Sequence, residues 1–198
     1  LDPESRELLR AAGADVRPGS DRVRFDRAMV MERIRTAPSE FTLHARNPDH
    51  SLHIGGDSVV FFPVGGPPYS SSLAEGRRPG TLADFRDFTR LTQRCDVLHS
   101  VTPTVEAQDV PLNERHLRTI HTALVESDKP VTLYARGHAP VAEQFELVRL
   151  AHGLTHDEFL AAPHCWTNIN TNSPRQLDVP MSMGIIDFAR AGQMVVMT

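Results

Sequence analysis

Three asparagines alternate near the carboxyl end of the chain, in the stretch CWTNINTNSP. Asn168, Asn170 and Asn172 share one face if this stretch is extended, because side chains two residues apart in a strand point the same way. Asparagine is depleted in strands, so three at this spacing exceed what a strand end requires. Their amides donate and accept hydrogen bonds, which indicates a polar ligand nearby. The plainer alternative is a strand-ending turn at Ser173–Pro174.

Two earlier apolar runs also end in side chains that can do chemistry, and α/β folds place their sites at such ends. The run VTLYAR ends with Tyr134 and Arg136 and is followed by His138. The run DVLHSV leads into a segment with four further candidates: His99, Thr102, Glu106 and Asp109. For His99, which alternates with Leu98, a structural role in the core or on the surface is favoured over a functional one.

Ten histidines raise the question of a metal site. His116 and His121 are five residues apart, which does not put them on one face of a helix. The sequence has no HExxH motif and no HxH pair after a strand, and it has no GxSxG motif. We therefore expect no metal site and no serine or cysteine nucleophile.

The elements that must position these residues alternate regularly from about residue 81. Strands are predicted to begin near residues 96, 131, 165 and 194, roughly 30 to 35 residues apart, which is the length of a βα unit. Helical patterns lie between them, at about 81–91, 113–126, 141–152 and 181–190, with a short helix opened by Thr155 and Glu158. This alternation predicts a parallel sheet covered by helices.

The first part of the chain, residues 1–57, has a different pattern. Asp2 and Asp26 are placed to cap two helices, and RPGSD makes a turn before the second. FTLHAR and SLHIGG in this part, and SVVFF directly after it, are short β-rich runs separated by turn-prone residues. We predict an N-terminal helix-plus-hairpin region over 1–57 and an α/β region over 58–198.

The α/β region is predicted to be part of a (β/α)8 barrel rather than an open nucleotide-binding sheet. No glycine fingerprint follows its first strand. A complete barrel takes about 250 residues, so 58–198 would form about half of the eight units. The chain also stops within a predicted strand, so we expect a truncated chain that is inactive alone. A half barrel leaves strand edges unpaired, which predicts a homo-oligomer or association with the rest of the polypeptide.

Composition narrows the class of protein. The 198 residues carry a net charge of −4, which argues against nucleic-acid binding. No run of apolar residues is long enough for a membrane span, and no stretch resembles a signal peptide. The two cysteines, Cys95 and Cys165, are far apart and form no CxxC pair, which favours a cytoplasmic protein.

Long ordered stretches of the sequence resemble the trimethylamine methyltransferase family. They are FTLHARNPDHSLHIGGDSVVFFPVGGPPYSSS, RRPGTLADFRDFTRL, VTPTVEAQDVP and NTNSPRQLDVPMSMGIIDFARAGQMVVMT. The resemblance is strongest over 41–111 and 163–198, and it implies a TIM barrel. It also implies transfer of a methyl group from a tertiary or quaternary methylamine, such as trimethylamine or a betaine-like compound, to the cobalt of a separate corrinoid protein.

This resemblance gives the candidate residues a role. The corrinoid (cobalamin) belongs to a partner protein, so the chain needs no bound cofactor of its own, only a dry pocket that orients the substrate. A methylated cation favours aromatic faces, and a betaine carboxylate favours Arg or amide donors. The substrate-binding candidates are therefore Tyr134, Arg136, Asn168, Asn170 and Asn172.

Two alternatives come from other classes. One is a metal-dependent hydrolase or lyase on the same barrel, using His99, Glu106 and His138. The other is a fragment that is not an enzyme and only associates with itself. Metal analysis separates the first from a methyltransferase, and intact mass against the open reading frame decides the second.

Overall fold

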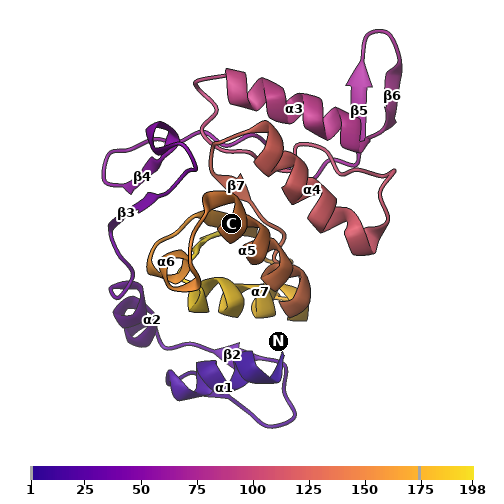
Figure 1. Ribbon diagram of the computed structural model, residues 1–198. Helices are drawn as coiled ribbons and strands as arrows, with labels where there is room; N and C mark the ends of the chain where they lie inside the picture. Colours follow the sequence, from indigo (N-terminus) through magenta and orange to yellow (C-terminus); the bar gives the residue numbers. More distant parts are fainter. Residues whose placement is uncertain (1, 174) are drawn as a thin grey trace.

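A three-stranded parallel sheet lies at the centre of the computed structural model, which describes residues 2–173 and 175–198 (Figure 1). Leu1 lies outside these described residues, and so does Pro174, which was expected to help end the asparagine run. The strands are adjacent in chain order: β7 (Val131–Thr132), β8 (Cys165–Ile169) and β9 (Met194–Met197). The chain is thus a mixed α/β structure, as the alternation of elements predicts.

The strand predicted at 96–101 is reduced to one residue, Val101, which forms an isolated parallel bridge with Val131. The reason is Lys129, whose ammonium donates to the carbonyls of Thr92, Cys95 and Leu98 at 2.8, 2.9 and 2.7 Å. The carbonyls of Cys95 and Leu98, which follow α3, are thus held by the lysine and are not offered to a neighbouring strand. The prediction of at least four parallel strands is therefore corrected to three strands and one bridge.

The run SVVFF at 58–62 is also not a strand. Phe61 donates its backbone N–H to Nδ1 of His99 at 2.9 Å, and its carbonyl accepts from the His99 N–H at 2.9 Å. The His99 imidazole thus takes the place of the backbone carbonyl that would accept the Phe61 N–H in a strand ladder. The segment still lies beside 99–103, because Thr102 donates its hydroxyl to the Pro63 carbonyl and Gly66 donates its N–H to the Pro103 carbonyl, both at 2.8 Å.

Helices cover the outer side of the sheet (Figure 1). They are α3 (Leu82–Arg94), α4 (Leu112–Glu126), α5 (His138–His152), α6 (His156–Ala161) and α7 (Val179–Arg190). Along this layer α3 packs on α4, α4 on α5 and α5 on α7. Thr81 and Thr155 open α3 and α6 with capping boxes, as predicted. The main core lies between these helices and the strands and includes Phe85, Leu133 and Phe188, each at most 2% exposed.

The N-terminal region has the predicted two helices and hairpin. Its elements are α1 (Pro3–Ala11), β1 (Asp15–Val16), β2 (Val23–Arg24), α2 (Arg27–Ile34), β3 (Glu40–Leu43) and β4 (Leu52–Gly55), with a 3-10 turn at Pro48–His50. Asp2 and Asp26 cap α1 and α2 through their side chains. The pairs β1–β2 and β3–β4 are antiparallel. The division of the chain at residue 57 stays a prediction.

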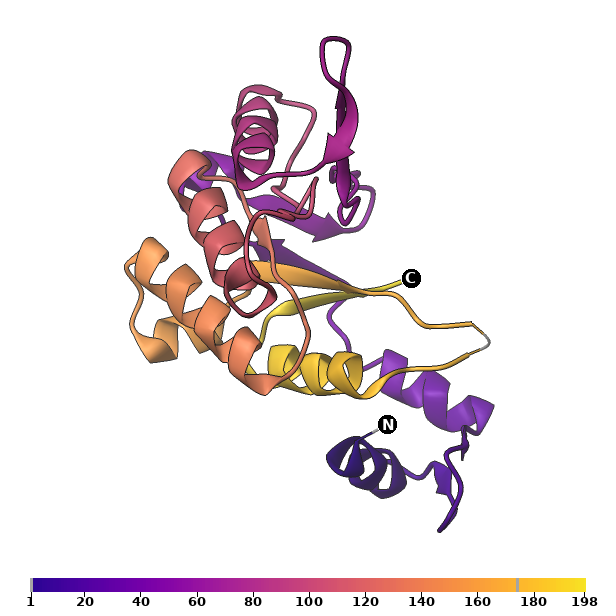
Figure 2. The ribbon, with the colours of Figure 1, turned by 90° about the vertical axis from the view of Figure 1, so that its right-hand side faces the viewer.

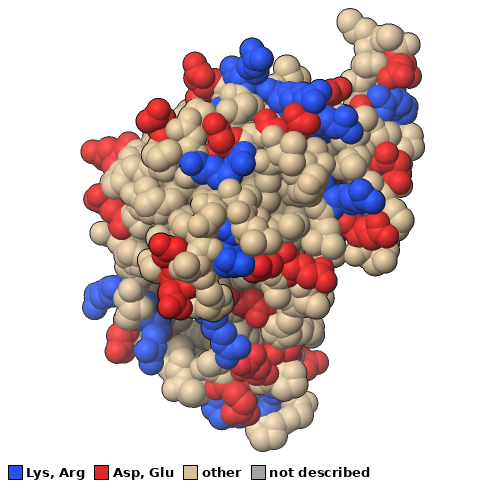
Figure 3. Space-filling model, viewed as in Figure 1, with Lys and Arg blue, Asp and Glu red and all other residues tan. Residues whose placement is uncertain are grey.

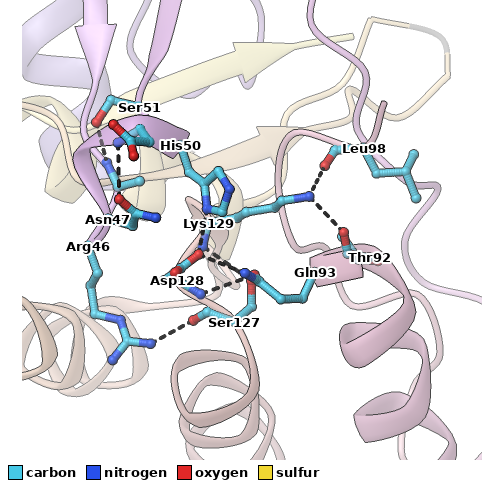
Figure 4. Close-up of polar contacts among 12 residues, drawn as sticks. Arg46, Asn47, His50, Ser51, Thr92, Gln93, Leu98, Ser127, Asp128 and Lys129 are labelled. Carbon is cyan, nitrogen blue, oxygen red and sulfur yellow. Dashed lines mark hydrogen bonds and ion pairs between the residues drawn. The ribbon is translucent and has the colours of Figure 1, made fainter. Parts of the chain in front are cut away.

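Polar contacts tie the loop between β3 and β4 to the segment before β7 (Figure 4). Arg46 donates to the Ser127 carbonyl at 2.8 Å, and His50 Nδ1 contacts Asp128 at 2.5 Å. The hairpin itself packs on the sheet, because Leu43 and Leu52 form a second small core with Trp166. The hairpin therefore closes one side of the sheet near the strand that carries the asparagines.

A second hairpin, β5 (Tyr69–Ser72) with β6 (Gly76–Pro79), projects from the body (Figure 2). The sequence analysis missed it, because the serine run Ser70–Ser72 has no apolar alternation. Leu73 at its turn is fully exposed. Acidic and basic side chains are interspersed over the face shown in Figure 3. Within the described residues, no helix is both long enough and apolar enough to cross a membrane.

Candidate functional site

Side chains from adjacent strands face the inner side of the sheet in layers set by the register. Thr132 pairs with Trp166, and Trp166 pairs with Met194. Two residues further along β8, Asn168 pairs with Val196. Because strand side chains alternate, the next residues on this face are Tyr134 and then Arg136 after β7, Asn170 after β8, and Thr198 after β9. The alternation seen in the sequence thus becomes one polar wall.

This wall borders a pocket of about 570 Å³ beyond the carboxyl ends of the strands. Four of the five predicted residues line it: Tyr134, Arg136, Asn168 and Asn170. The remaining wall is formed by the segment from Phe62 to Gly66, by Thr102, Pro103 and Glu106, and by Met181, Val196 and Thr198. In Figure 2, β8 and β9 run side by side toward this edge.

The fifth predicted residue, Asn172, does not line the pocket. Its backbone exchanges two hydrogen bonds with Gln176, at 2.7 and 2.8 Å, and its side chain is exposed. The plainer interpretation, a turn after the strand, describes this position. The alternation of asparagines continues past Ile169, where β8 ends, so the pattern alone placed Asn172 beside the other two although it lies outside this pocket.

Tyr134 is held from two directions. Gln144, fully buried in α5, accepts from the Tyr134 N–H at 2.9 Å and donates to its carbonyl at 3.0 Å. The Tyr134 hydroxyl donates to Glu106 Oε1 at 3.1 Å. Burial, and then the neighbouring Glu106 carboxylate, raise the pKa of Tyr134 well above its usual value. The hydroxyl therefore stays protonated and acts as a fixed donor.

Glu106 is a pocket residue that sequence reasoning assigned to the hydrolase alternative. Its side chain is 14% exposed, and Oε2 lies 3.9 Å from Nη1 of Arg115 on α4. Gln144 was missed altogether, although a glutamine between Val141 and Val148 on one helical face was a usable signal. Both residues hydrogen-bond to Tyr134, so the tyrosine is the most firmly held side chain of the pocket wall.

Arg136 is exposed, and its guanidinium carbon lies 5.7 Å from the centre of the Tyr134 ring. This is within the range of a cation–π contact. Gly137 follows with a φ of +88°, which lets the backbone turn from the strand directly into α5. A side chain at residue 137 would strain this turn, and the turn fixes where Arg136 leaves the sheet.

The two asparagines in the pocket form a cluster with Thr198. Asn168 donates from Nδ2 to Asn170 Oδ1 at 3.2 Å. The Thr198 hydroxyl contacts Asn168 Oδ1 at 3.3 Å and also hydrogen-bonds to Asn170. All three side chains are exposed, so the two amides and the Thr198 hydroxyl are accessible to a ligand in the pocket.

Trp166 is both core and wall. It is 5% exposed, packs with Leu43 and Leu52, and donates from its indole nitrogen to the Ser100 hydroxyl at 2.8 Å. Its ring centre lies 4.3 Å from that of Phe62, which also lines the pocket. The floor of the pocket is therefore aromatic.

The residues of the hydrolase alternative are not brought together. His99 is engaged with Phe61 and is not part of the pocket wall. His138 pairs with Asp187 at 2.8 Å in a separate hollow of about 390 Å³ between α5, α6 and α7. Across 2–173 and 175–198, no three His, Cys, Asp or Glu side chains are arranged to hold a metal ion.

A parallel sheet covered by helices, with a polar and aromatic pocket beyond its carboxyl ends, defines an α/β chain of the kind that binds small molecules. The profile of the trimethylamine methyltransferase (MTTB) family matches residues 1–198. The chain belongs to this family.

Two curated relatives come from Desulfitobacterium hafniense. A glycine betaine methyltransferase from strain Y51 is 34% identical over 191 residues, which are 96% of this chain and 39% of the relative. The trimethylamine methyltransferase MttB from strain DSM 10664 / DCB-2 is 26% identical over 190 residues, which are 96% of this chain and 38% of the relative. The chain thus spans about two-fifths of the length of these relatives.

Proposed function

We propose that the chain carries the substrate pocket of a methyltransferase that moves a methyl group from a tertiary or quaternary methylamine to the cobalt of a corrinoid protein. The observation that supports this most is the pocket lined by Tyr134, Arg136, Asn168 and Asn170. The substrate is trimethylamine or a betaine-like compound. Family membership and the names of the two relatives support methyl transfer from such amines.

The work of this chain is binding, orientation and exclusion of water. A bound corrinoid supplies reduced cobalt as the nucleophile, and it belongs to the partner. The residues fit such an arrangement, because Asn168, Asn170 and Thr198 are exposed and leave the pocket open to an approaching protein. Tyr134 and the aromatic floor attract the methylated cation, and the amides hold its polar groups.

We further propose that 58–198 form about half of a (β/α)8 barrel and that 1–57 form a separate N-terminal region. Strand order that follows chain order, helices on the outer side and an inner face of alternate side chains support the barrel. In a longer form of the polypeptide, a further strand would pair in parallel with β9. An antiparallel neighbour there would contradict this architecture.

Oligomer and compartment remain parts of the same proposal. We expect a homo-oligomer, because β9 presents an edge that has one paired neighbour in the described structure. The expected compartment is the cytoplasm, where unpaired cysteines such as Cys95 and Cys165 are the rule. Analytical ultracentrifugation over a range of concentrations measures the association. A single monomeric species at all concentrations would contradict it.

The test of function uses the polypeptide as its open reading frame encodes it, mixed with a reduced corrinoid protein and one methylamine at a time. Methylation of cobalt changes the visible absorption spectrum, and we expect this change with trimethylamine or glycine betaine. Tyr134→Ala should lower kcat/KM at least about tenfold. Tyr69→Ala, at the chain's other tyrosine, is the control. No spectral change with any tertiary or quaternary methylamine would contradict the proposal.

A further inference from the structure

Two opposite charges of the pocket wall meet at one side chain. The Tyr134 hydroxyl donates to Glu106, and the Arg136 guanidinium carbon lies 5.7 Å from the centre of the Tyr134 ring. Glu106 and Arg136 both line the pocket. The pocket therefore presents an anion and a cation that are separated by roughly one tyrosine side chain.

The Glu106 carboxylate is only partly compensated. Its side chain is largely buried, and the tyrosine hydroxyl is its single hydrogen-bond donor within the described chain. The nearest cation, Nη1 of Arg115, lies 3.9 Å from Oε2, which is longer than a hydrogen bond. A buried carboxylate is stable when it is paired, so a cation bound in the pocket would complete its environment.

The positive charge of Arg136 also lacks a partner of opposite charge within the described residues. Within the described residues its guanidinium makes no ion pair, while its five N–H donors suit a carboxylate. Continuing the register of Thr132 with Trp166 places Asn170 opposite Arg136, where it adds an amide to the same part of the wall. The Arg136 side of the pocket is thus a place for an anion.

We propose that the pocket recognises both charges of a zwitterionic methyl donor. Glu106 and the Tyr134 ring bind the quaternary ammonium. Arg136, together with Asn168 and Asn170, binds the carboxylate. This inference rests on the proposed function and narrows its substrate to betaine-like compounds. Glu106 and Arg136 are then specificity-determining residues. Gln144 is a positioning residue, because it fixes the backbone of Tyr134 without lining the pocket.

Three ligands separate the two charges. Glycine betaine carries both. 3,3-Dimethylbutanoate has the same shape and carboxylate but a neutral carbon in place of the nitrogen, and choline keeps the ammonium but has a hydroxyl in place of the carboxylate. Isothermal titration calorimetry measures their Kd values on the polypeptide that the open reading frame encodes. The variants are Glu106→Gln and Arg136→Gln, with Glu32→Gln on α2 and Arg35→Gln directly after it as matched controls.

Glu106→Gln should weaken glycine betaine at least about tenfold and dimethylbutanoate less than about threefold. Arg136→Gln should weaken glycine betaine and dimethylbutanoate at least about tenfold and choline less than about threefold. If Glu106→Gln does not fold, Glu106→Asp takes its place, and its effect on the Kd of glycine betaine is compared with its effect on the Kd of dimethylbutanoate. Equal effects on all three ligands, no effect, or no binding of glycine betaine by the unaltered protein would overturn the inference.

The calorimetry is independent of methyl transfer. If the variants change the three Kd values as predicted but no cobalt is methylated, the inference about charge recognition stands and the proposed function is overturned. If methyl transfer from trimethylamine is observed but each variant changes all three Kd values equally, the proposed function stands and the inference about charge recognition is overturned.

Discussion

Asn168 and Asn170 are hydrogen-bonded to each other and to Thr198, and all three border the pocket. Asn168→Ala or Asn170→Ala should weaken binding of glycine betaine by about 1–3 kcal/mol, because an amide partner of a bound polar group is lost. Asn172→Ala is the matched control, since this residue lies outside the pocket wall. Calorimetric Kd values measure the change. Unchanged affinity in both pocket variants would place the substrate elsewhere.

His152 should make the free energy of unfolding depend on pH. It is half-buried beside His44, His164 and Arg46, and desolvation, followed by the nearby His164, lowers the pKa of His152 to about 4. The ordinary histidine pKa is about 6.5, so between these values the unfolded state binds more protons than the folded state. The free energy of unfolding should therefore fall as the pH drops from about 6.5 to about 4.

Urea unfolding at several pH values measures this fall. His152→Gln should make the free energy of unfolding less dependent on pH in that window, because one of the titrating groups is removed. The pKa of His164 is also lowered by burial, so part of the slope should persist. An identical slope in protein and variant would show that His152 does not contribute.

Position in the chain was enough to predict that Tyr134, Arg136, Asn168 and Asn170 lie together at strand ends, and all four line one pocket. Their role in substrate binding stays a prediction. Glu106 could not be assigned to Tyr134, because 28 residues separate them and only the fold brings them together. Asn172 lies outside this pocket, because the alternating pattern continues past the end of β8 into a turn.

At the scale of elements, α7 approaches the end of β7 very closely at Gly184. A Cβ there would lie 2.6 Å from Cβ of Ala135 and 3.0 Å from its carbonyl oxygen. Gly184→Ala should lower the free energy of unfolding by about 1–3 kcal/mol through overpacking. It should also disturb Tyr134 and Arg136, which flank Ala135. Chemical unfolding measures the loss, with Ala189→Ser on the exposed side of α7 as control. Full stability in Gly184→Ala would show that the helix can shift without cost.

Lys129 is the chain's single lysine and connects α3 to β7. Its ammonium is buried and donates to three carbonyls at the end of α3 and in the turn that follows. Lys129→Met should lower the free energy of unfolding by about 1–3 kcal/mol or more, because buried acceptors lose their donor. Thermal and urea unfolding test this. Arg94→Met, on the exposed side of α3, controls for loss of a positive charge.

Lys129 also explains why the elements were only partly predictable. Helix starts depend on capping residues within three or four positions, so Thr81, Thr155 and Asp26 were readable. Neither 96–101 nor 58–62 forms a strand, because a distant side chain bonds to its backbone. Lys129 donates to the Leu98 carbonyl, and His99 accepts from the Phe61 N–H. Apolar runs alone cannot show such competition.

At the scale of the whole molecule, the described chain has one face closed and one face open. The helices and the β3–β4 hairpin bury the outer side and the Trp166 end of the sheet. The pocket remains accessible beyond the carboxyl ends of the strands. This asymmetry agrees with the proposed substrate site, which a partner protein would approach from the open side.

The central claim is that this pocket is where the methyl donor binds. A crystal structure of the polypeptide as its open reading frame encodes it, grown with glycine betaine, tests the claim most directly. The account predicts the ligand in the pocket, with its ammonium beside Tyr134 and its carboxylate toward Arg136. A ligand bound in the hollow beside His138 and Asp187, or at a site without contact to Tyr134, would contradict it.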